Sequence, residues 1–384
     1  MTVKSLTTAD FDEAFQLSRY AFQAKPTQEQ TEFARTQWAS VKASQFGIKD
    51  NDRIISKLTL LSLHIHLYNT IIPMGGIASV ASYPEARRRG SVRKLLLHSL
   101  EQMKENGQLI SYLAPFSVPF YRKFGWEILC DEVTYTLRKD QLPLPLPNIE
   151  GSLSRTSYTD SRIKTVYEQS ICHGMLHRDD DWWARKQEGF KENETVLYED
   201  ADGTPMGYIV YHIENSKWKT EEFVYVNQAA LKALLHFIGQ HDSMLQEATL
   251  TVPESKGMHF FLPDPLTSAE TKPYFMARIV DFSQFIAMLP FKEEGQFTIR
   301  IQDECAAWND QTFSLSIQES HVTCEPTSAP PTIFMTIQVA SSLLMGYRRP
   351  EFFRDTGLIT GERNDVHAFL QTLPTEQPTL HDFF

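Results

Sequence analysis

The sequence predicts a mixed α+β and α/β protein built from three domains. Two segments, 77–107 and 221–242, have the pattern of a strand that leads directly into a helix. A third segment, 297–320, alternates apolar and polar residues as a pair of antiparallel strands does. This order is typical of layered folds in which helices cover a sheet. A chain of 384 residues is long enough for two or three such domains.

Two proline-containing stretches mark the expected domain boundaries. The first, 141–148 (QLPLPLPN), predicts an extended linker because proline favours an extended backbone. The second is 261–273 (FLPDPLTSAETKP). The blocks that they separate have ordinary domain size. The expected domains are residues 1–143, 144–272 and 273–384.

The composition limits the possible classes of function. The chain is 42% hydrophobic and 22% charged, with a net charge of −11, which argues against nucleic-acid binding and weakly favours cationic substrates. No apolar run approaches the roughly 20 residues that span a bilayer, so no membrane partner is expected. The first residues include acidic side chains and no apolar signal segment, so we expect a cytoplasmic protein. The cysteines show no zinc or disulfide spacing, which suits a reducing compartment; they are Cys130, Cys172, Cys305 and Cys324.

The most informative stretch is 80–97, VASYPEARRRGSVRKLLL. A strand ends there, helical spacing begins after Gly90, and Asn106-Gly107 predicts the end of that helix. The first amides of a helix have no intrahelical partner and carry partial positive charge, so they bind anions. Gly90 leaves room for a phosphate, and arginines at 87–89 add charge. The stretch predicts a site for a phosphorylated cofactor, with a solvated basic turn as the alternative.

Two motifs in this region resemble those of the GNAT acetyltransferases. Residues 87–92, RRRGSV, resemble the pyrophosphate loop of that superfamily, usually written R/Q-x-x-G-x-G/A. Residues 120–126, FYRKFGW, resemble its F-Y-x-x-x-G-F segment, between a predicted strand at 109–115 and another after Gly125. The loop departs from the usual pattern at Val92, where Gly or Ala is common. The RRRG form with a larger residue there is similar to one branch, the Eis (enhanced intracellular survival) acetyltransferases.

The second block repeats the strand-to-helix order without the features of an anion site. The strand at 221–226 leads into a helix for which Asn227 is the predicted N-cap. Neither a glycine nor an arginine stands at this helix start. We therefore expect a degenerate copy of the first domain that keeps the fold and lacks the cofactor site. The Eis resemblance implies tandem GNAT-like domains of this kind, followed by a C-terminal domain like sterol carrier protein.

The resemblance implies acetyl-CoA as co-substrate and assigns residues to it. Backbone groups of 80–82 would meet the pantetheine arm, 88–93 would hold the pyrophosphate, and Phe116 and Ser117 would border the cofactor where two strands diverge. No metal is expected. The predicted cofactor-binding residues are Val80, Ala81, Ser82, Arg87, Arg88, Arg89, Gly90, Ser91, Val92, Arg93, Phe116 and Ser117.

Tyr121 is the predicted general acid. A positioned hydroxyl that protonates the leaving thiolate removes developing negative charge from the transition state. The reference pKa of a phenol, about 10, keeps it protonated at neutral pH. A packed aromatic residue near a turn is the alternative. Because the acyl group passes directly to the amine in a ternary complex, no covalent enzyme intermediate is needed.

The chain ends in two aromatic residues, Phe383 and Phe384. A terminus that stays in solvent is usually polar, so these residues predict that the end of the chain docks onto the protein. The residues alone favour simple hydrophobic anchoring. The Eis resemblance implies instead that the carboxylate of Phe384 accepts the proton of the substrate amine. A terminal carboxylate has a reference pKa of about 3.5 and is a weak base unless burial raises that value.

Two histidine pairs have the spacing of metal ligands, but neither predicts a metal site. His64 and His66 alternate on one face of a strand, with no third ligand apparent. His173 and His177 are four residues apart, but Gly174 and the missing Glu of H-E-x-x-H argue against a zinc helix.

Two acidic groups also have structural and functional alternatives. The aspartates at 179–181 predict a helix N-terminus, with an acidic rim for polyamines as the alternative. Glu29, Glu32 and Trp38 predict one face of an amphipathic helix, with part of an amine pocket as the alternative.

The resemblance implies an acetyl-CoA-dependent N-acetyltransferase for polyamine-like small molecules such as aminoglycosides, assembled as a hexamer. Two other functions stay open. One is a protein lysine N-acetyltransferase, for which an open acidic groove would be evidence. The other is a non-catalytic acyl-CoA or lipid-binding regulator, which would bind acetyl-CoA and transfer nothing.

Overall fold

The computed structural model describes residues 2–39, 42–143, 149–319 and 321–384. These residues form two compact units. Part of the predicted linker, 144–148, lies outside the described residues. Among the described helices, none has the length and apolar character needed to cross a bilayer. Unit 1 comprises Met1–Leu129, Tyr274–Pro378 and Asp382–Phe384, and unit 2 comprises Cys130–Pro273 and Thr379–His381.

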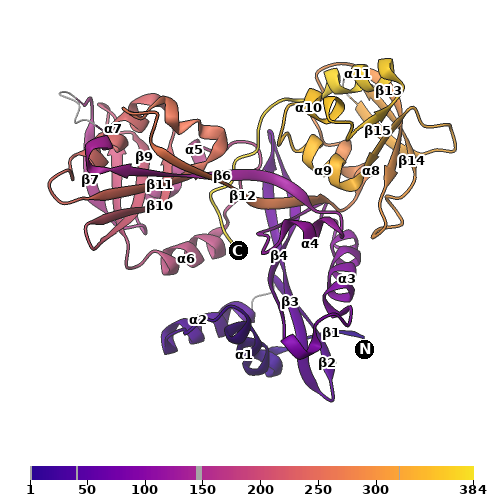
Figure 1. The fold of residues 1–384 in the computed structure, drawn as a ribbon, viewed down its shortest axis with the longest axis horizontal. Helices are drawn as coiled ribbons and strands as arrows, with labels where there is room; N and C mark the ends of the chain where they lie inside the picture. The colour runs from indigo at the N-terminus through magenta and orange to yellow at the C-terminus, as the bar shows by residue number, and fades with distance from the viewer. Residues whose placement is uncertain (1, 40–41, 144–148, 320) are drawn as a thin grey trace. The chain divides into compact units, whose positions relative to one another are not determined.

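The amino-terminal part of unit 1 is a sheet with strand order β1-β2-β3-β4-β5-β12. Its neighbouring strands are antiparallel except β4 and β5, which are parallel. Figure 1 shows α3 on one face of β2–β4 and α1 with α2 on the other. The elements are β1 Val3–Ser5, α1 Phe11–Ala21, α2 Gln28–Trp38, β2 Ala43–Asp50, β3 Arg53–Leu67, β4 Thr70–Ser82, α3 Ser91–Glu105, β5 Ile110–Leu113, α4 Val118–Arg122, β6 Glu127–Arg138 and β12 Ser268–Ile279; the last two strands continue into unit 2.

Helix α3 confirms the pattern expected after Gly90. It buries Leu95, Leu96, Leu100 and Met103 in the same core as residues of β3. The helix ends at Asn106, and Gly107 follows with a φ of +68°. A left-handed glycine at this place ends the helix as a C-cap does. The predicted strand and helix therefore stand next to each other as β4 and α3.

Strand β4 leaves its parallel neighbour soon after pairing with it. The β4–β5 pairs run only from Met74 with Ile110 to Gly76 with Tyr112. Beyond this point β4 carries a bulge, because the register with β3 passes from Thr59–Ala78 to Lys57–Ala81. A bulge bends the strand and strengthens its twist. The end of β4 therefore pairs with β3 on one side only.

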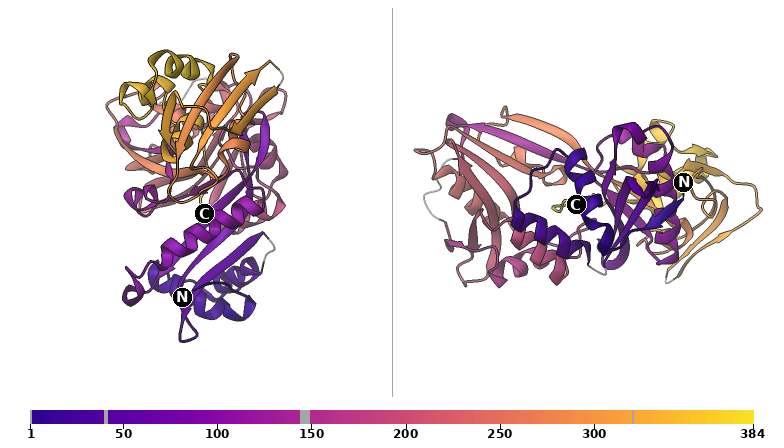
Figure 2. Two further views of the ribbon diagram at one scale, coloured as in Figure 1. Left: turned by 90° about the vertical axis from the view of Figure 1, so that its right-hand side faces the viewer. Right: turned by 90° about the horizontal axis from the view of Figure 1, so that it is seen from below.

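The remaining part of unit 1, residues 282–378, is called here the C-terminal domain. It has a sheet of order β15-β14-β13-β16-β17. The predicted antiparallel pair is confirmed as β13 and β14, and Figure 2 shows these orange strands beside the yellow C-terminal helices. The elements are α8 Phe282–Ile286, β13 Gly295–Gln302, β14 Thr312–Gln318, β15 His321–Pro326, β16 Ile333–Thr336, α9 Ile337–Leu344, α10 Pro350–Asp355, β17 Thr360–Gly361 and α11 Arg363–Thr372.

Unit 2 has strand order β6-β11-β10-β9-β8-β7 and a core on each face of this sheet. In β8, Val196 and Tyr198 belong to the cluster that contains α7, whereas Leu197 belongs to the cluster that contains α5. This alternation follows from the two-residue period of a strand. The elements are β7 Ser152–Thr156, α5 Ser161–Gln169, α6 Asp180–Gly189, β8 Glu194–Glu199, β9 Pro205–Glu214, β10 Lys217–Tyr225, α7 Gln228–Gly239 and β11 Glu247–Pro253.

The strand-to-helix step of unit 2 is also confirmed. Strand β10 is followed by α7, and the side chain of Asn227 accepts a hydrogen bond from the amide of Ala230 at 2.9 Å. Asn227 is therefore the N-cap, as predicted. Short 3₁₀ turns complete the chain at Thr8–Asp10, Pro84–Ala86, Lys139–Gln141, Glu254–Lys256 and Met258–Phe260.

The end of the chain docks through one of its two aromatic residues. The ring of Phe384 lies 5.0 Å from that of Phe275, and a Cβ on Gly76 would come within 2.8 Å of it. The hydroxyl of Tyr274 donates to the carbonyl of Asp382 at 2.9 Å. Phe383 is 67% exposed, although its ring centroid lies 6.0 Å from that of Phe275, so the predicted docking of the chain end rests mainly on Phe384 and Asp382. Successive side chains of an extended segment point to opposite sides, which leaves Phe384 partly buried and Phe383 exposed.

Candidate active site

A cleft of about 640 Å³ lies in unit 1 beside the turn between β4 and α3. Ten of the twelve residues predicted to bind the cofactor line it; Arg89 and Ser117 are not among them. The end of α1, the end of β4, the first turn of α3 and the region of α4 all contribute. The lining residues are Ala21, Phe22, Val80, Ala81, Ser82, Ala86, Arg87, Arg88, Gly90, Ser91, Val92, Arg93, Phe116, Phe120 and Phe124.

The start of α3 presents uncapped backbone amides to this cleft. Gly90 is the N-cap, with a φ of +76° and no side chain to accept from the following amides. A Cβ on Gly90 would meet nothing within 4 Å, so the space before the helix is open. The buried hydroxyl of Ser91 has no hydrogen-bond partner among the described residues. An anion in this position would satisfy both the amides and the hydroxyl.

Arginine side chains add positive charge to the same turn. Arg87, Arg88 and Arg93 line the cleft, and no described carboxylate lies within ion-pair distance of them. Arg89 is directed elsewhere, since its guanidinium lies 3.6 Å from the carboxylate of Asp50. Guanidinium groups bind phosphate through paired hydrogen bonds. The turn is therefore suited to a pyrophosphate in both charge and geometry.

The end of β4 forms one side of the cleft. Val80, Ala81 and Ser82 follow the bulge and lie beyond Gly76, the last residue of β4 that pairs with β5. Backbone groups on that edge have no partner from β5. An extended chain with amide groups can bind such an edge as an added strand does.

Tyr121 lies on α4 behind two phenylalanines of the cleft, Phe116 and Phe120, which form an aromatic wall. It is 2% exposed, and its ring centroid is 5.3 Å from that of Phe116 and 5.2 Å from that of Phe120. Both of these phenylalanines line the cleft. Burial raises the pKa of Tyr121 above the usual value of 10, so the hydroxyl is protonated at neutral pH. Among the described residues, none accepts a hydrogen bond from it.

Phe384 lies at the point where β4 and β5 separate. Its ring packs against Gly76, whose partner Tyr112 is the last residue of β5 in the parallel pairing. Neither Phe384 nor Tyr121 lines the cleft itself. The structure thus brings the turn, the β4 edge and the aromatic wall together, with Tyr121 behind that wall.

The sequence did not predict that Phe22 and Phe120 line the cleft. Phe22 ends α1 and is 57% exposed, and Phe116 is 71% exposed. An exposed aromatic side chain is the kind of residue that covers a bound ligand. No local signal relates the end of α1 to a turn some 65 residues later, so only the fold could show that Phe22 belongs here. Phe120 and Phe124 were part of the motif segment and have a visible signal there. The other lining residues not predicted are Ala21 and Ala86.

The histidine pairs and acidic groups considered in the sequence lie in positions that fit structural roles. His64 and His66 share a face of β3, and His173 and His177 lie outside any helix. Throughout the described ranges, no three His, Cys, Asp or Glu side chains gather closely enough to hold a metal ion. Asp179 is the N-cap of α6, as the acidic run predicted, because its carboxylate accepts from the amide of Trp182 at 2.9 Å. Glu29 and Glu32 are exposed on α2, and Trp38 is its last residue.

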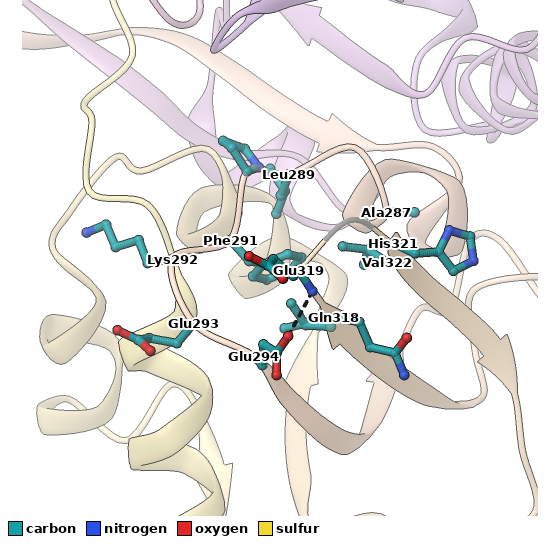
Figure 3. A pocket seen from close by; sticks show the side chains of 12 residues that line it. Ala287, Leu289, Phe291, Lys292, Glu293, Glu294, Gln318, Glu319, His321 and Val322 are labelled. Carbon is teal, nitrogen blue, oxygen red and sulfur yellow. Dashed lines mark hydrogen bonds between the residues drawn. The ribbon is translucent and has the colours of Figure 1, made fainter.

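A second pocket, of about 500 Å³, lies in the C-terminal domain (Figure 3). One of its hydrogen bonds joins the amide of Glu319 to the carboxylate of Glu294 at 2.9 Å. Its described lining residues include Lys292 but no arginine, so they do not offer the guanidinium groups of the first cleft. The lining residues are Ala287, Leu289, Pro290, Phe291, Lys292, Glu293, Glu294, Ile317, Gln318, Glu319, His321 and Val322.

Family models match three parts of the chain. An acetyltransferase (GNAT) domain matches residues 2–129, a second acetyltransferase (GNAT) domain matches 174–279, and a sterol carrier protein domain matches 282–381. These matches confirm the predicted fold class of tandem GNAT domains followed by a sterol-carrier-like domain. The boundaries expected at 143/144 and 272/273 stay predictions.

Individual relatives agree with this division. N-acetyltransferase Eis of Mycobacterium tuberculosis is 23% identical over 300 residues, 73% of this chain and 72% of the relative. A probable N-acyltransferase from Enterococcus faecalis has a solved structure with a TM-score of 0.93 and 27% identity, covering 100% of this chain and 99% of that one. Eis1 from Mycobacterium abscessus superposes with a TM-score of 0.83 at 17% identity, covering 100% of both chains.

The chain therefore belongs to the GNAT acyltransferases, enzymes that move an acyl group from a coenzyme A thioester to an amine. Within that superfamily it is Eis-like, as the RRRG turn indicated.

Proposed function

We propose that the enzyme transfers the acetyl group of acetyl-CoA to small molecules that carry several amines, a class that includes aminoglycosides. The observation that carries this proposal is the cleft at the uncapped start of α3, next to a buried and protonated tyrosine. The net charge of −11 favours cationic acceptors over anionic ones. The relatives named N-acetyltransferase support the acetyl group as the one transferred.

The residues of the cleft fit each part of acetyl-CoA. In our proposal, the amides that follow Gly90 and the hydroxyl of Ser91 bind the pyrophosphate, with Arg87, Arg88, Arg89 and Arg93 supplying charge. The backbone of β4 from Val80 to Ser82 pairs with the amides of the pantetheine arm. Val92, Phe116 and Ser117 border the arm. The proposal for Arg89 and Ser117 has the least support, because neither lines the cleft.

Tyr121 is the proposed general acid. Its hydroxyl donates a proton to the sulfur as the carbon–sulfur bond of the thioester breaks, and coenzyme A leaves as a thiol. Burial holds the phenol in its protonated form, and none of the described residues competes for its proton. The proton that the acceptor amine loses returns to the phenolate through the proposed proton acceptor and solvent, which restores the phenol.

Phe384 is the proposed proton acceptor. Its carboxylate accepts the proton that the substrate amine loses as the new carbon–nitrogen bond forms. Support comes from the ring of Phe384, which packs on Phe275 and against Gly76 at the point where β4 and β5 separate. The donor and the amine react directly in a ternary complex, and positioning supplies much of the rate.

The test is release of the coenzyme A thiol with acetyl-CoA and a panel of aminoglycosides, linear polyamines and lysine peptides. We expect turnover with the first two groups and little with peptides. Turnover confined to peptides would identify a protein lysine acetyltransferase. Binding of acetyl-CoA without turnover of any amine would identify a non-catalytic acyl-CoA-binding protein.

A second test addresses Phe384. One alanine added after Phe384 moves the carboxylate by about 3.8 Å along the chain. We expect kcat to fall by roughly tenfold or more while the Kd of acetyl-CoA is unchanged. Unchanged kcat would remove Phe384 from the mechanism.

We also propose that the enzyme acts in the cytoplasm and assembles as a hexamer. The hexamer rests on the Eis resemblance, and the cytoplasmic location rests on cysteines whose spacing suits no disulfide framework. Sedimentation equilibrium of the full chain would test the assembly, and a monomer at micromolar concentration would contradict it.

A further inference from the structure

Helix α4, which carries Tyr121, is too short to hold its shape alone. It runs only from Val118 to Arg122, little more than one turn. Isolated helices of this length are unstable in water, and the last carbonyls of any helix lack intrahelical donors. The position of Tyr121 must therefore depend on groups outside the helix.

Three consecutive carbonyls at the end of α4 each accept a hydrogen bond from a distant side chain. The amide of Gln338, on α9, donates to the carbonyl of Arg122 at 2.8 Å. The thiol of Cys305 donates to the carbonyl of Lys123 at 3.6 Å. The guanidinium of Arg278, through Nε, donates to the carbonyl of Phe124 at 2.7 Å.

Arg278 is the strongest of these three donors. It is fully buried, and its other nitrogens bind the carbonyl of Ile279 at 3.0 Å and the carboxylate of Asp303 at 2.8 and 2.9 Å. Its guanidinium also lies 5.6 Å from the ring of Trp126. A charged donor to a carbonyl is stronger than a neutral one and fixes a direction as well.

Asp303 ties this group to the C-terminal domain. Its carboxylate also accepts from the amide of Cys305 at 3.0 Å and from the side chain of Asn309 at 3.1 Å. Asp303 is 3% exposed, so the ion pair with Arg278 lies within the protein. The loop between β13 and β14 thus holds both Arg278 and Cys305 in place.

Gly125 gives a reason for the glycine in the FYRKFGW segment. Its φ is +95°, and a Cβ there would stand 2.6 Å from Nε of Arg278. Any other residue would force the guanidinium away from the carbonyl of Phe124. The lack of a side chain at Gly125 therefore leaves room for the guanidinium of Arg278.

We propose that the C-terminal domain positions Tyr121 by capping the end of α4, through Gln338, Cys305 and the Asp303-held Arg278. This inference rests on the proposed role of Tyr121 as general acid. Gln338, Cys305 and Arg278 are positioning residues, and none of them touches substrate. The sterol-carrier-like domain then supports acetyl transfer by holding α4 in position, whether or not it binds a lipid.

Gln338→Ala in the full chain is the first test. Gln338 is a partly exposed side chain whose loss leaves the core intact. We expect kcat to fall by roughly three- to tenfold, with the Kd of acetyl-CoA within about twofold of wild type, because the cleft is unchanged and only the hydroxyl moves. Ser342→Ala is the matched control: Ser342 also lies on α9 and donates at 2.9 Å, but to Ile128 beyond α4. Its kcat should equal that of wild type.

Two further readouts separate positioning from a general structural effect. Arg278→Lys should lower kcat by roughly 10- to 100-fold and shift the alkaline limb of the kcat profile to lower pH, because a loosened Tyr121 is less buried. Gln338→Ala should cost nothing further in a Tyr121→Phe background.

The outcomes distinguish the two proposals. Equal losses from Gln338→Ala in the wild-type and Tyr121→Phe backgrounds, or an equal loss in Ser342→Ala, would overturn the positioning role while leaving Tyr121 as the acid. Wild-type kcat in Tyr121→Phe would overturn both. If Arg278→Lys fails to fold, the comparison of Gln338→Ala in the wild-type and Tyr121→Phe backgrounds tests the positioning role by itself.

Discussion

The two GNAT domains differ most at the helix that follows the central strand. In the first domain, α3 begins at Gly90 without a side-chain cap, and the space before it is open. In the second, α7 begins at Asn227, whose side chain occupies the amide of Ala230. The same strand-to-helix step therefore leaves uncapped amides that suit an anion in one domain and forms a capped helix end in the other. The two domains share the order of strand and helix. They differ in whether a side chain caps the first amides of the helix.

The strands before these helices show the same contrast. Both β4 and β10 leave their parallel neighbours and carry a bulge, at Ser79–Val80 and between Thr220 and Glu222. Beside β4 there is a cleft, whereas Glu222 on β10 is buried against Arg178 and Tyr158. At its bulge, the second domain therefore has a buried ionic core, whereas the first has a cleft.

Breaking that ionic core should give the largest effect. In Arg178→Met, Glu222 stays buried without its main partner, and we expect unfolding to cost about 3–5 kcal/mol less than in wild type. The Kd of acetyl-CoA should not change. Urea unfolding measures the first quantity and calorimetry the second. Arg185→Met is the control, since Arg185 stacks on Trp182 at 5.2 Å and has no described acidic partner. A weakened Kd in Arg178→Met would show that the second domain contributes to the cofactor site.

Acid should weaken the same core. Although burial opposes ionisation, the charges of Arg178 and Lys186 lower the pKa of Glu222 to about 2. A carboxylate with a lowered pKa stabilises the fold above its unfolded pKa, near 4.5, and loses that contribution as pH falls toward 2. The free energy of unfolding of wild type should therefore fall as the pH is lowered over this range. That of Glu222→Gln should depend less on pH.

Tyr121→Phe tests the chemistry of the first domain. We expect kcat to fall by roughly 10²-fold or more, the size of a lost general acid, with the Kd of acetyl-CoA unchanged. Thiol-release kinetics measure the change. Tyr225→Phe, at the end of β10 in the second domain, is the matched control and should keep wild-type kcat. Wild-type turnover in Tyr121→Phe would exclude Tyr121 as the acid.

Gly90→Asp gives the first domain a capping side chain at the position where α7 of the second domain has Asn227. Aspartate tolerates the left-handed backbone and caps helices well, so the variant should fold. The added charge faces the pyrophosphate position, and we expect the Kd of acetyl-CoA to rise by about tenfold or more. Gly107→Asp is the control, because Gly107 has a φ of +68° and open space at the other end of α3. Equal Kd values in both variants would contradict an anion site at Gly90.

The last prediction concerns Lys57, a buried lysine with no acidic partner among the described residues. Lys57 on β3 is 2% exposed, and its amine donates to the hydroxyl of Ser79 in the bulge at 2.8 Å. Burial lowers the pKa of Lys57 to about 7, whereas an unfolded lysine titrates near 10.5. Between these values the unfolded chain holds the extra proton, so stability should rise with pH by up to about 1.4 kcal/mol per unit.

Lys57→Met should remove that slope between pH 7 and 10 in urea unfolding. Lys49→Met is the control, since Lys49 is paired with Asp10 at 2.6 Å and its pKa is raised instead. An unchanged slope in Lys57→Met would assign the pH dependence to another group.

Local patterns predicted the parts of the site that depend on neighbouring residues. Gly90, the spacing of α3 and the cap at Asn227 are short-range features with a physical signature in the sequence. Long-range features were not predictable. Phe22 lines the cleft because the fold places the end of α1 beside the β4–α3 turn. Arg278 donates to the carbonyl of Phe124, which is 154 residues away in the sequence. The motif glycine at 125 was visible, but its reason appeared only with Arg278 beside it.

We propose that one of the two GNAT domains binds acetyl-CoA. Isothermal titration of the full chain with acetyl-CoA tests it most directly through the stoichiometry. We predict one acetyl-CoA per chain, with binding weakened by Gly90→Asp and unaffected by Asn227→Asp at the start of α7. Two acetyl-CoA molecules per chain, or one whose affinity ignores Gly90→Asp, would contradict it.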